Sequence, residues 1–289
     1  MSRVASFEPV IADRFLLAKV GPMLAHERHG AGSPIVLIHG IGHRRQGWDP
    51  IVPLLVAAGH EVITVDLPGH GESPAYDAQG KDVKTYLAEV FDELYDDLGI
   101  DRPHVVGNSL GGLIALQGAM NGNAGSVTCL SPAGFWKNDL DFLYVRGLFR
   151  TMITAAGLLA PVAPRLMKHT FGKALGFSWL VQHPGRIPED HALGDFRNML
   201  KARPAVKQLF QGAYRFEGPL PVPATIAWAE HDKVLLPYQG RVAEQRLPEA
   251  FHTIMKGVGH VPMSDNPELV ARVILESVAR AAKGTGAAA

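Results

Sequence analysis

The chain has 289 residues, and its 28 basic and 28 acidic side chains give a formal net charge of zero. A chain of this length forms one large domain or one domain with an inserted lobe, because α/β folds of about 250 residues commonly stay single. The balanced charge gives no electrostatic reason to bind nucleic acid or an anionic membrane surface, so we expect neither partner.

The single cysteine, Cys129, excludes an intramolecular disulfide and any multi-cysteine metal site. Near the N-terminus, Asp13 and Arg14 interrupt the sequence before any long apolar run, so the uninterrupted apolar centre of a signal peptide is missing. The most apolar internal stretch, residues 151–164, is shorter than the ~20 residues that cross a membrane. We therefore expect a cytoplasmic protein without a transmembrane helix, with Cys129 packed as a small hydrophobe.

Extended and helical patterns alternate along most of the chain. Gly21-Pro22 is a turn signal and predicts an opening β-hairpin over residues 16–28. The apolar run Ile35-Val36-Leu37-Ile38 indicates a strand buried on both faces. Further strands are expected at 61–65, 104–106, 126–130, 225–229 and 251–255, and helices at 48–58, 83–98, 110–120 and 267–282. This rhythm predicts an α/β fold with a mostly parallel, doubly wound sheet covered by helices on both faces.

The alternation stops between Pro132 and Pro219, where helical patterns and scattered prolines occur without a convincing strand. We interpret residues 132–219 as a helical insertion and residues 1–131 and 220–282 as the α/β core. Residues 283–289 are rich in glycine and alanine and are expected to form a disordered tail.

A Gly-x-Ser-x-Gly pattern, Gly107 to Gly111, lies directly after an apolar strand and before a helix. This strand-turn-helix context is the one in which a sharp turn presents the serine, here Ser109, as a nucleophile above the sheet. The helix N-terminus adds backbone N–H groups that can stabilise an oxyanion. A plain helix cap is the alternative interpretation of the serine, and the context favours the nucleophile.

A serine nucleophile needs a base to remove its proton and a carboxylate to orient that base. Two late strands end in suitable residues: Asp232 follows the strand at 225–229, and His260 lies in the loop after the strand at 251–255. Because active sites of open α/β sheets lie at the carboxyl ends of the strands, Ser109, Asp232 and His260 can converge. Glu230 is the alternative acid, and we prefer Asp232.

Five sequence blocks together resemble the α/β-hydrolase fold family, in the order and at the spacings usual for that family. The blocks are His39-Gly40-Ile41-Gly42, residues 66–73 (DLPGHGES), Gly107 to Gly112, His231-Asp232 with Pro237 downstream, and Gly259-His260-Val261-Pro262. The resemblance implies Ser109 as nucleophile, Asp232 as acid and His260 as base. It also implies an oxyanion hole from the backbone N–H groups of Ile41 and Leu110. His39, Gly40, Gly107 and Gly111, and likewise His70 and His231, are then expected to shape the turns.

The resemblance also narrows the chemistry. Haloalkane dehalogenases and epoxide hydrolases of this fold carry aspartate where this chain has Ser109, so neither reaction is favoured. Hydrolases that cleave carbon–carbon bonds share a similar Gly-Asn-Ser turn but usually follow the catalytic histidine with tryptophan, whereas Val261 follows His260 here. The leading expectation is a serine esterase acting by two-step acyl transfer, and a vinylogous-diketone hydrolase or a ligand receptor on the same scaffold are the alternatives.

The family usually places a helical cap where this chain has residues 132–219, and apolar cap residues could line an acyl pocket or form the cap's own core. The candidates are Phe135, Trp136, Phe142, Leu143, Leu148, Phe149, Met152, Leu158 and Leu159. We therefore expect a small-molecule ester with an apolar acyl group as substrate, and no cofactor or metal. Arg44 and Arg45, after the oxyanion loop, are expected to be solvated, with contact to an acidic substrate as the alternative. The oligomeric state stays open.

Overall fold

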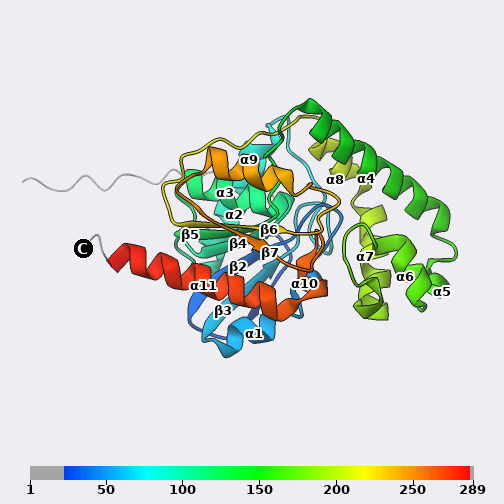
Figure 1. Ribbon diagram of the computed structural model, residues 1–289, viewed down its shortest axis with the longest axis horizontal. Helices are drawn as coiled ribbons and strands as arrows, with labels where there is room; N and C mark the ends of the chain where they lie inside the picture. Colours follow the sequence, from blue (N-terminus) through cyan, green and yellow to red (C-terminus); the bar gives the residue numbers. More distant parts are fainter. Residues whose placement is uncertain (1–22, 287–289) are drawn as a thin grey trace, which may run out of the picture.

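A twisted sheet lies at the centre of the part of the chain that the computed structural model describes, residues 23–286 (Figure 1). Its strand order is β1-β3-β2-β4-β5-β6-β7. Strands β2 to β7 run parallel, and β1 pairs antiparallel with β3 at one edge. The strands are β1 His26–His29, β2 Ser33–Ile38, β3 His60–Val65, β4 His104–Asn108, β5 Ser126–Leu130, β6 Ala224–Ala229 and β7 Phe251–Met255. The predicted mostly parallel α/β sheet is confirmed.

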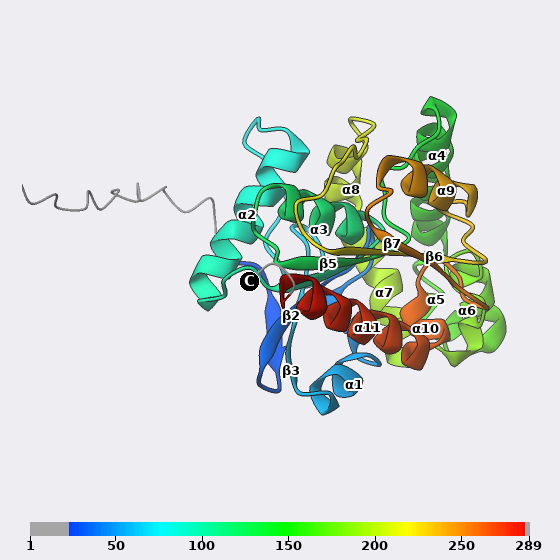
Figure 2. The ribbon, with the colours of Figure 1, turned by 60° about the vertical axis from the view of Figure 1, so that its left-hand side comes forward.

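Helices cover both faces of the sheet (Figure 2). On one face lie α2 Val83–Leu98, α3 Leu110–Met120 and α9 Tyr238–Arg246, and on the other lie α1 Val52–Ala57 and α11 Pro267–Gly286. Because both faces are covered, the central strands are buried on both sides, and every residue of β4 and β5 is buried. The carboxyl ends of the parallel strands therefore share one edge, where polar side chains can gather.

The segment between β5 and β6 forms helices that lie beyond that edge, at the end of the molecule on the right in Figure 1. It contains α4 Asp139–Leu159, α5 Ala163–Leu166, α6 Thr170–Phe177, the 3₁₀ turn Pro184–Arg186, α7 Glu189–Lys201 and α8 Arg203–Leu209. The structure assigns no strand to these residues, all of which it describes. Their treatment as a separate cap, with the boundaries 132–219, remains our proposal.

Helix α4 is, within residues 23–286, the one helix with a length and composition compatible with crossing a membrane. Its 21 residues include the apolar stretch noted in the sequence, and only 22% of its most apolar window is buried. A single helix of this kind is weak support for a membrane span. Its exposed apolar side chains nevertheless need an explanation.

Two local expectations differ from the structure. The helix expected at 48–58 is a short 3₁₀ helix, Arg45–Trp48, followed by α1, because Pro50 and Pro53 lack the N–H groups that a continuous helix would use. Residues 283–286 continue α11 instead of starting a disordered tail, since a formed helix extends by one hydrogen bond per added residue. Residues 287–289 and the first arm of the expected hairpin lie outside the described residues, and β1 pairs with β3.

Candidate active site

Ser109 occupies a strained turn between β4 and α3. Its backbone angles are φ 57° and ψ −115°, a conformation that costs a non-glycine residue on the order of 1–3 kcal/mol. Three backbone hydrogen bonds maintain the turn: the Ser109 N–H donates to the Leu130 carbonyl at 3.0 Å, and its own carbonyl accepts from Leu113 and Ala133. The strain and these bonds hold the hydroxyl side chain at the wall of a cavity.

Gly107 and Gly111 make this turn sterically possible. A Cβ atom at Gly107 would lie 2.0 Å from the carbonyl oxygen of Gly111, and one at Gly111 would lie 2.2 Å from that of Ile38. Both neighbours are backbone atoms that cannot swing aside. The spacing of the Gly-x-Ser-x-Gly pattern thus follows from how closely α3 packs on β4 and β2.

Asp232 and His260 form a buried pair at the carboxyl ends of β6 and β7. The Nδ1 atom of His260 lies 2.7 Å from Oδ2 of Asp232. The other oxygen, Oδ1, accepts from the backbone N–H groups of Val234 and Leu235, each at 2.8 Å, and this fixes the carboxylate. With Nδ1–H donating to the carboxylate, Nε2 is the nitrogen left to accept a proton.

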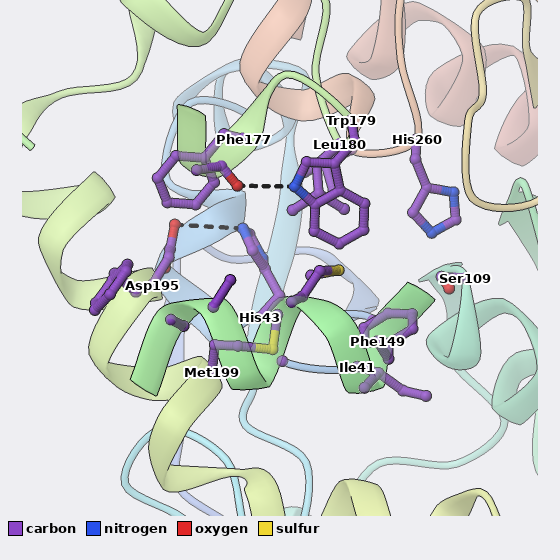
Figure 3. A pocket seen from close by; sticks show the side chains of 18 of the residues that line it. Ile41, His43, Ser109, Phe149, Phe177, Trp179, Leu180, Asp195, Met199 and His260 are labelled. Atoms are coloured by element: carbon purple, nitrogen blue, oxygen red, sulfur yellow. Dashed lines mark hydrogen bonds and ion pairs between the residues drawn. The ribbon is translucent and has the colours of Figure 1, made fainter. Parts of the chain in front are cut away.

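Ser109 and His260 line the same cavity, at the same end of it (Figure 3). The structure thus brings together the three residues that the sequence singled out, although Ser109 lies more than a hundred residues before Asp232 and His260. Glu230, the alternative acid, is exposed and accepts a hydrogen bond from the Gly257 N–H at 2.9 Å. Geometry therefore favours Asp232 over Glu230 as the partner of His260.

Two backbone N–H groups beside Ser109 are free to bind an oxyanion. Within residues 23–286, neither the Ile41 nor the Leu110 N–H donates a hydrogen bond to another protein group. Gly40 lets the loop approach closely, because a Cβ there would lie 3.0 Å from Cβ of Ser109. Ile41 also lines the cavity. Two unpaired donors flanking a nucleophile are the arrangement that stabilises a tetrahedral oxyanion.

Two buried histidines hold the oxyanion loop in shape. Nε2 of His39 accepts from the Leu67 N–H and Nε2 of His70 accepts from the Gly42 N–H, each at 3.0 Å. Burial lowers the pKa of His39 well below its usual value and lowers the pKa of His70 to about 4. Both rings are therefore neutral at neutral pH, as acceptance of an N–H requires.

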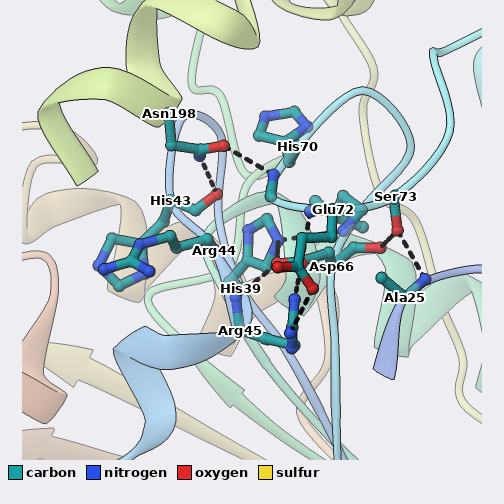
Figure 4. Close-up of polar contacts among 12 residues, drawn as sticks. Ala25, His39, His43, Arg44, Arg45, Asp66, His70, Glu72, Ser73 and Asn198 are labelled. Atoms are coloured by element: carbon teal, nitrogen blue, oxygen red, sulfur yellow. Dashed lines mark hydrogen bonds and ion pairs between the residues drawn. The ribbon is translucent and has the colours of Figure 1, made fainter. Parts of the chain in front are cut away.

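Arg45 differs from the expectation of a solvated cation or a substrate contact. It is buried, and its guanidinium contacts the carboxylates of Asp66 and Glu72 (Figure 4). It also contacts the carboxylate of Glu27. Burial alone would lower the pKa of Arg45, but hydrogen bonds to Glu72, Asp66 and Glu27 outweigh it and raise the pKa. The motif carboxylates pair with the cation, so Arg45 supports the loop from inside.

Arg44 also pairs within the protein. Its Nε donates to Oδ1 of Asp195 on α7 at 2.8 Å, and Nε2 of His43 lies 3.5 Å from the other oxygen of the same carboxylate. This contact joins the oxyanion loop to the helices that follow β5. The expectation that Arg44 is solvated is therefore wrong, because no local pattern indicates which distant carboxylate would face it.

The cavity beside Ser109 has a volume of about 190 Å³. Its wall away from the catalytic residues is mostly apolar and comes from α4, α6 and α7 (Figure 3). Of the nine apolar residues singled out in the sequence, Phe149, Met152 and Leu159 line it. Trp179 and Met199, which the sequence analysis did not single out, line it as well.

Asn108 and Asp265 are two further residues that sequence reasoning missed. The Asn108 side-chain amide donates to the backbone carbonyls of Leu130 and His260, at 3.1 and 2.9 Å. The buried carboxylate of Asp265 accepts from the backbone N–H groups of Gly259, Gln182 and His183. Asn108 lies inside the motif as a variable position and Asp265 lies beyond it, so only their contacts indicate a role.

Other reactive groups give no second centre in the described residues. Cys129 is buried in β5, and burial raises the pKa of its thiol. No cluster of three or more histidine, cysteine, aspartate or glutamate side chains within residues 23–286 could hold a metal ion.

Comparisons with known proteins agree with this architecture. The model of the alpha/beta hydrolase family matches residues 35–273. An uncharacterized protein of Mycobacterium tuberculosis is 30% identical over 254 residues, covering 82% of this chain and 73% of the relative. Epoxide hydrolase EphH of the same organism is 29% identical, covering 65% of this chain and 91% of the relative.

A solved thermophilic esterase from Thermogutta terrifontis superposes with a TM-score of 0.69 at 20% identity, covering 89% of this chain and 93% of that structure, a likeness of fold. These relatives support a hydrolase, but they do not share one substrate class. Taken with the sheet order and the turn at Ser109, they show that the chain belongs to the α/β-hydrolase family.

Proposed function

We propose that the protein is a serine hydrolase that cleaves a carboxylic ester through an acyl-enzyme on Ser109. The buried 2.7 Å contact between His260 and Asp232, facing the same cavity as Ser109, is the observation that carries the proposal. A nucleophile, an oriented base and two free N–H donors are together sufficient for acyl transfer. Epoxide hydrolysis is not proposed, because Ser109 stands where the epoxide hydrolases of this fold carry aspartate.

The reaction has two halves. His260 takes the proton from Ser109 as the Ser109 oxygen attacks the ester carbonyl carbon, and the Ile41 and Leu110 N–H groups bind the resulting oxyanion. The alcohol then leaves with the proton from His260. A water molecule, deprotonated by His260, attacks the acyl-enzyme in the second half, which releases the acid and returns the proton to Ser109.

The cavity supports an apolar acyl group. Its aromatic and aliphatic walls, with Phe149, Trp179 and Met199, favour burial of hydrocarbon, and its volume suits a small or medium-chain acid. The lone cysteine fits a reducing compartment, so a cytoplasmic location is part of the proposal.

Hydrolysis of p-nitrophenyl esters from acetate to laurate tests the proposal. We expect wild type to turn over and Ser109→Ala to lose at least ~100-fold in kcat. Ser33→Ala, a matched change at an exposed serine far from the cavity, should retain wild-type rates. Intact-mass spectrometry during turnover should find the acyl group on wild type and not on Ser109→Ala.

A wild type that hydrolyses none of these esters would contradict ester hydrolysis. Turnover of a vinylogous diketone would then support carbon–carbon bond cleavage. Ligand binding without turnover of either substrate would support the receptor alternative.

A further inference from the structure

The charges of the chain are unevenly distributed. Between Phe142 and Pro188 there are six basic residues and no acidic one, so the rest of the neutral chain carries an excess of six acids. The basic residues are Arg146, Arg150, Arg165, Lys168, Lys173 and Arg186. The zero net charge of the whole chain does not reveal this uneven distribution. The expectation that electrostatics gives no reason to bind an anionic surface therefore does not hold for this part of the molecule.

The same segment exposes large apolar side chains. Leu158 at the end of α4 is 79% exposed, and Phe171 on α6 is 76% exposed. Val162, which lies between them in the sequence, and Leu175, which follows Phe171 on α6, are exposed as well. Large contiguous apolar exposure on a folded protein marks an interaction site. We define the cap face as these apolar residues together with three exposed cations of the same segment: Leu158, Val162, Phe171, Leu175, Arg150, Arg165 and Lys168.

Part of the cap face lies at the entrance of the catalytic cavity. Ala155 and Leu175 line the cavity and are themselves exposed, so the cavity opens between α4 and α6. Leu158 lies three residues after Ala155 on α4, and Phe171 lies four residues before Leu175 on α6, so each pair shares one side of its helix. The exposed Leu158 and Phe171 therefore lie on the same sides of these helices as the residues at the cavity entrance.

We propose that the cap face docks the protein on the surface of an anionic lipid bilayer. Lysine and arginine at such a surface meet lipid phosphates, while leucine and phenylalanine enter the boundary between headgroups and acyl chains. Both kinds of side chain are present in this segment, whose helices lie at the right-hand end of the molecule in Figure 1.

A second copy of the chain suits the cap face less well. A twofold interface would place the cap face against its own copy, because such interfaces are self-complementary. Arg150, Arg165 and Lys168 would then face cations of equal sign with no carboxylate between residues 142 and 188 to pair with them. Exposed Lys168 reaches Glu189 at 3.6 Å, outside that segment, and this ion pair is too exposed to neutralise the face.

Docking would turn the cavity entrance toward the lipid. An apolar ester dissolved in the bilayer could then enter the apolar cavity and reach Ser109. This last consequence rests on the proposed function, whereas the binding itself does not.

Co-sedimentation with vesicles tests the docking. We expect the protein to bind vesicles of phosphatidylcholine mixed with an equal amount of phosphatidylglycerol more tightly than vesicles of phosphatidylcholine alone, and to lose affinity as salt is added. The variant Arg150→Gln/Arg165→Gln/Lys168→Gln should bind the mixed vesicles at least ~10-fold more weakly, since each basic residue contributes about fivefold. Leu158→Ser/Phe171→Ser should also weaken binding.

Matched controls lie on other faces of the molecule. Arg241→Gln/Lys256→Gln/Arg272→Gln removes three exposed cations, and Ile254→Ser removes an exposed apolar side chain, and both should bind like wild type. Leu158 and Phe171 do not line the cavity, so their variants should keep the wild-type melting temperature and the wild-type hydrolysis of soluble p-nitrophenyl acetate.

Equal binding to both vesicle types, or binding that the cap-face variants leave unchanged, would overturn the proposal. A dimer in sedimentation velocity that Leu158→Ser/Phe171→Ser abolishes, without vesicle binding, would assign the face to a second copy and also overturn it. Vesicle binding by a protein that hydrolyses no ester would overturn the proposed function and leave the docking intact.

Discussion

The side-chain amide of Asn108 donates a hydrogen bond to the backbone carbonyl of His260 at 2.9 Å, across 152 residues of sequence. Asn108 directly precedes the proposed nucleophile, and His260 is the proposed base. The bond therefore connects the two strand ends that carry the reacting groups, and it fixes the height of the histidine loop above the serine turn.

Replacement of Asn108 by alanine should lower kcat about 10-fold with little change in KM, because His260 would lose an anchor while the acyl cavity keeps its walls. Steady-state kinetics on a p-nitrophenyl ester measures kcat and KM separately. Asn121→Ala, on the exposed end of α3, is the matched control and should behave like wild type. An unchanged kcat for Asn108→Ala would remove Asn108 from a positioning role.

The acid can be identified by two matched amide substitutions. Asp232→Asn should lower kcat by roughly 10⁴, because an asparagine beside Nδ1 of His260 no longer holds the ring in the productive tautomer. Glu230→Gln should stay within a few-fold of wild type, since Glu230 is exposed and bonds the Gly257 N–H. The reverse order of the two rate losses would make Glu230 the acid.

Asp265 connects the loop of His260 to the segment after α6. Its carboxylate accepts from the Gly259 N–H at 2.8 Å and from the Gln182 and His183 N–H groups. Asp265→Asn places an amide N–H₂ against these donors, so we expect a loss of about 1–3 kcal/mol in the free energy of unfolding and a lower kcat. Chemical denaturation and kinetics measure the two effects.

Asp190→Asn, at an exposed carboxylate on α7, is the control for this change. If Asp265→Asn matched that control in both stability and kcat, the hydrogen bonds of the Asp265 carboxylate would contribute neither to stability nor to catalysis.

Acid should destabilise the protein through its buried histidines. Burial lowers the pKa of His70 to about 4 and that of His104 to about 3, while in the unfolded chain a histidine titrates near ~6.5. Between these values the unfolded chain binds more protons, so stability is present above pH ~6.5 and is lost as the pH falls toward the folded-state pKa. Each ring should cost about 2 kcal/mol between pH 7 and pH 5.

Urea denaturation at pH 7 and pH 5 measures this loss. His104→Gln should reduce the difference between the two pH values, because the buried ring between Ser126 and Thr128 is gone. His169→Gln, at an exposed histidine, should leave it unchanged. A variant of His104 with the full wild-type pH dependence would contradict the assignment.

Activity should fall on acidification for a separate reason, since His260 must be neutral to accept the proton of Ser109. A pH–rate profile of wild type measures this directly. A rate that stays flat between pH 5 and 8 would argue against His260 as the base.

The sequence alone determined the core of the fold and the residues of the proposed triad. The apolar pattern and the turn residues between the elements located α2, α3, β5 and β7 to the residue, because both are local signals, as is Gly99 at the end of α2. The roles of Gly107, Ser109 and Gly111 could be predicted for the same reason, because the steric constraint that requires glycine acts within one turn.

Only the tertiary structure decided which side chains meet. The sequence predicted a solvated Arg45, whereas the fold places Asp66, Glu27 and Glu72 around it. No sequence pattern indicated a role for Asn108 or Asp265, because their hydrogen-bond partners lie in distant segments. The uneven charge between residues 142 and 188 can be counted in the sequence, but the exposure of Leu158 and Phe171 in the same segment cannot be predicted from it. Such contacts depend on how distant segments pack, and packing is a property of the whole chain rather than of any local pattern.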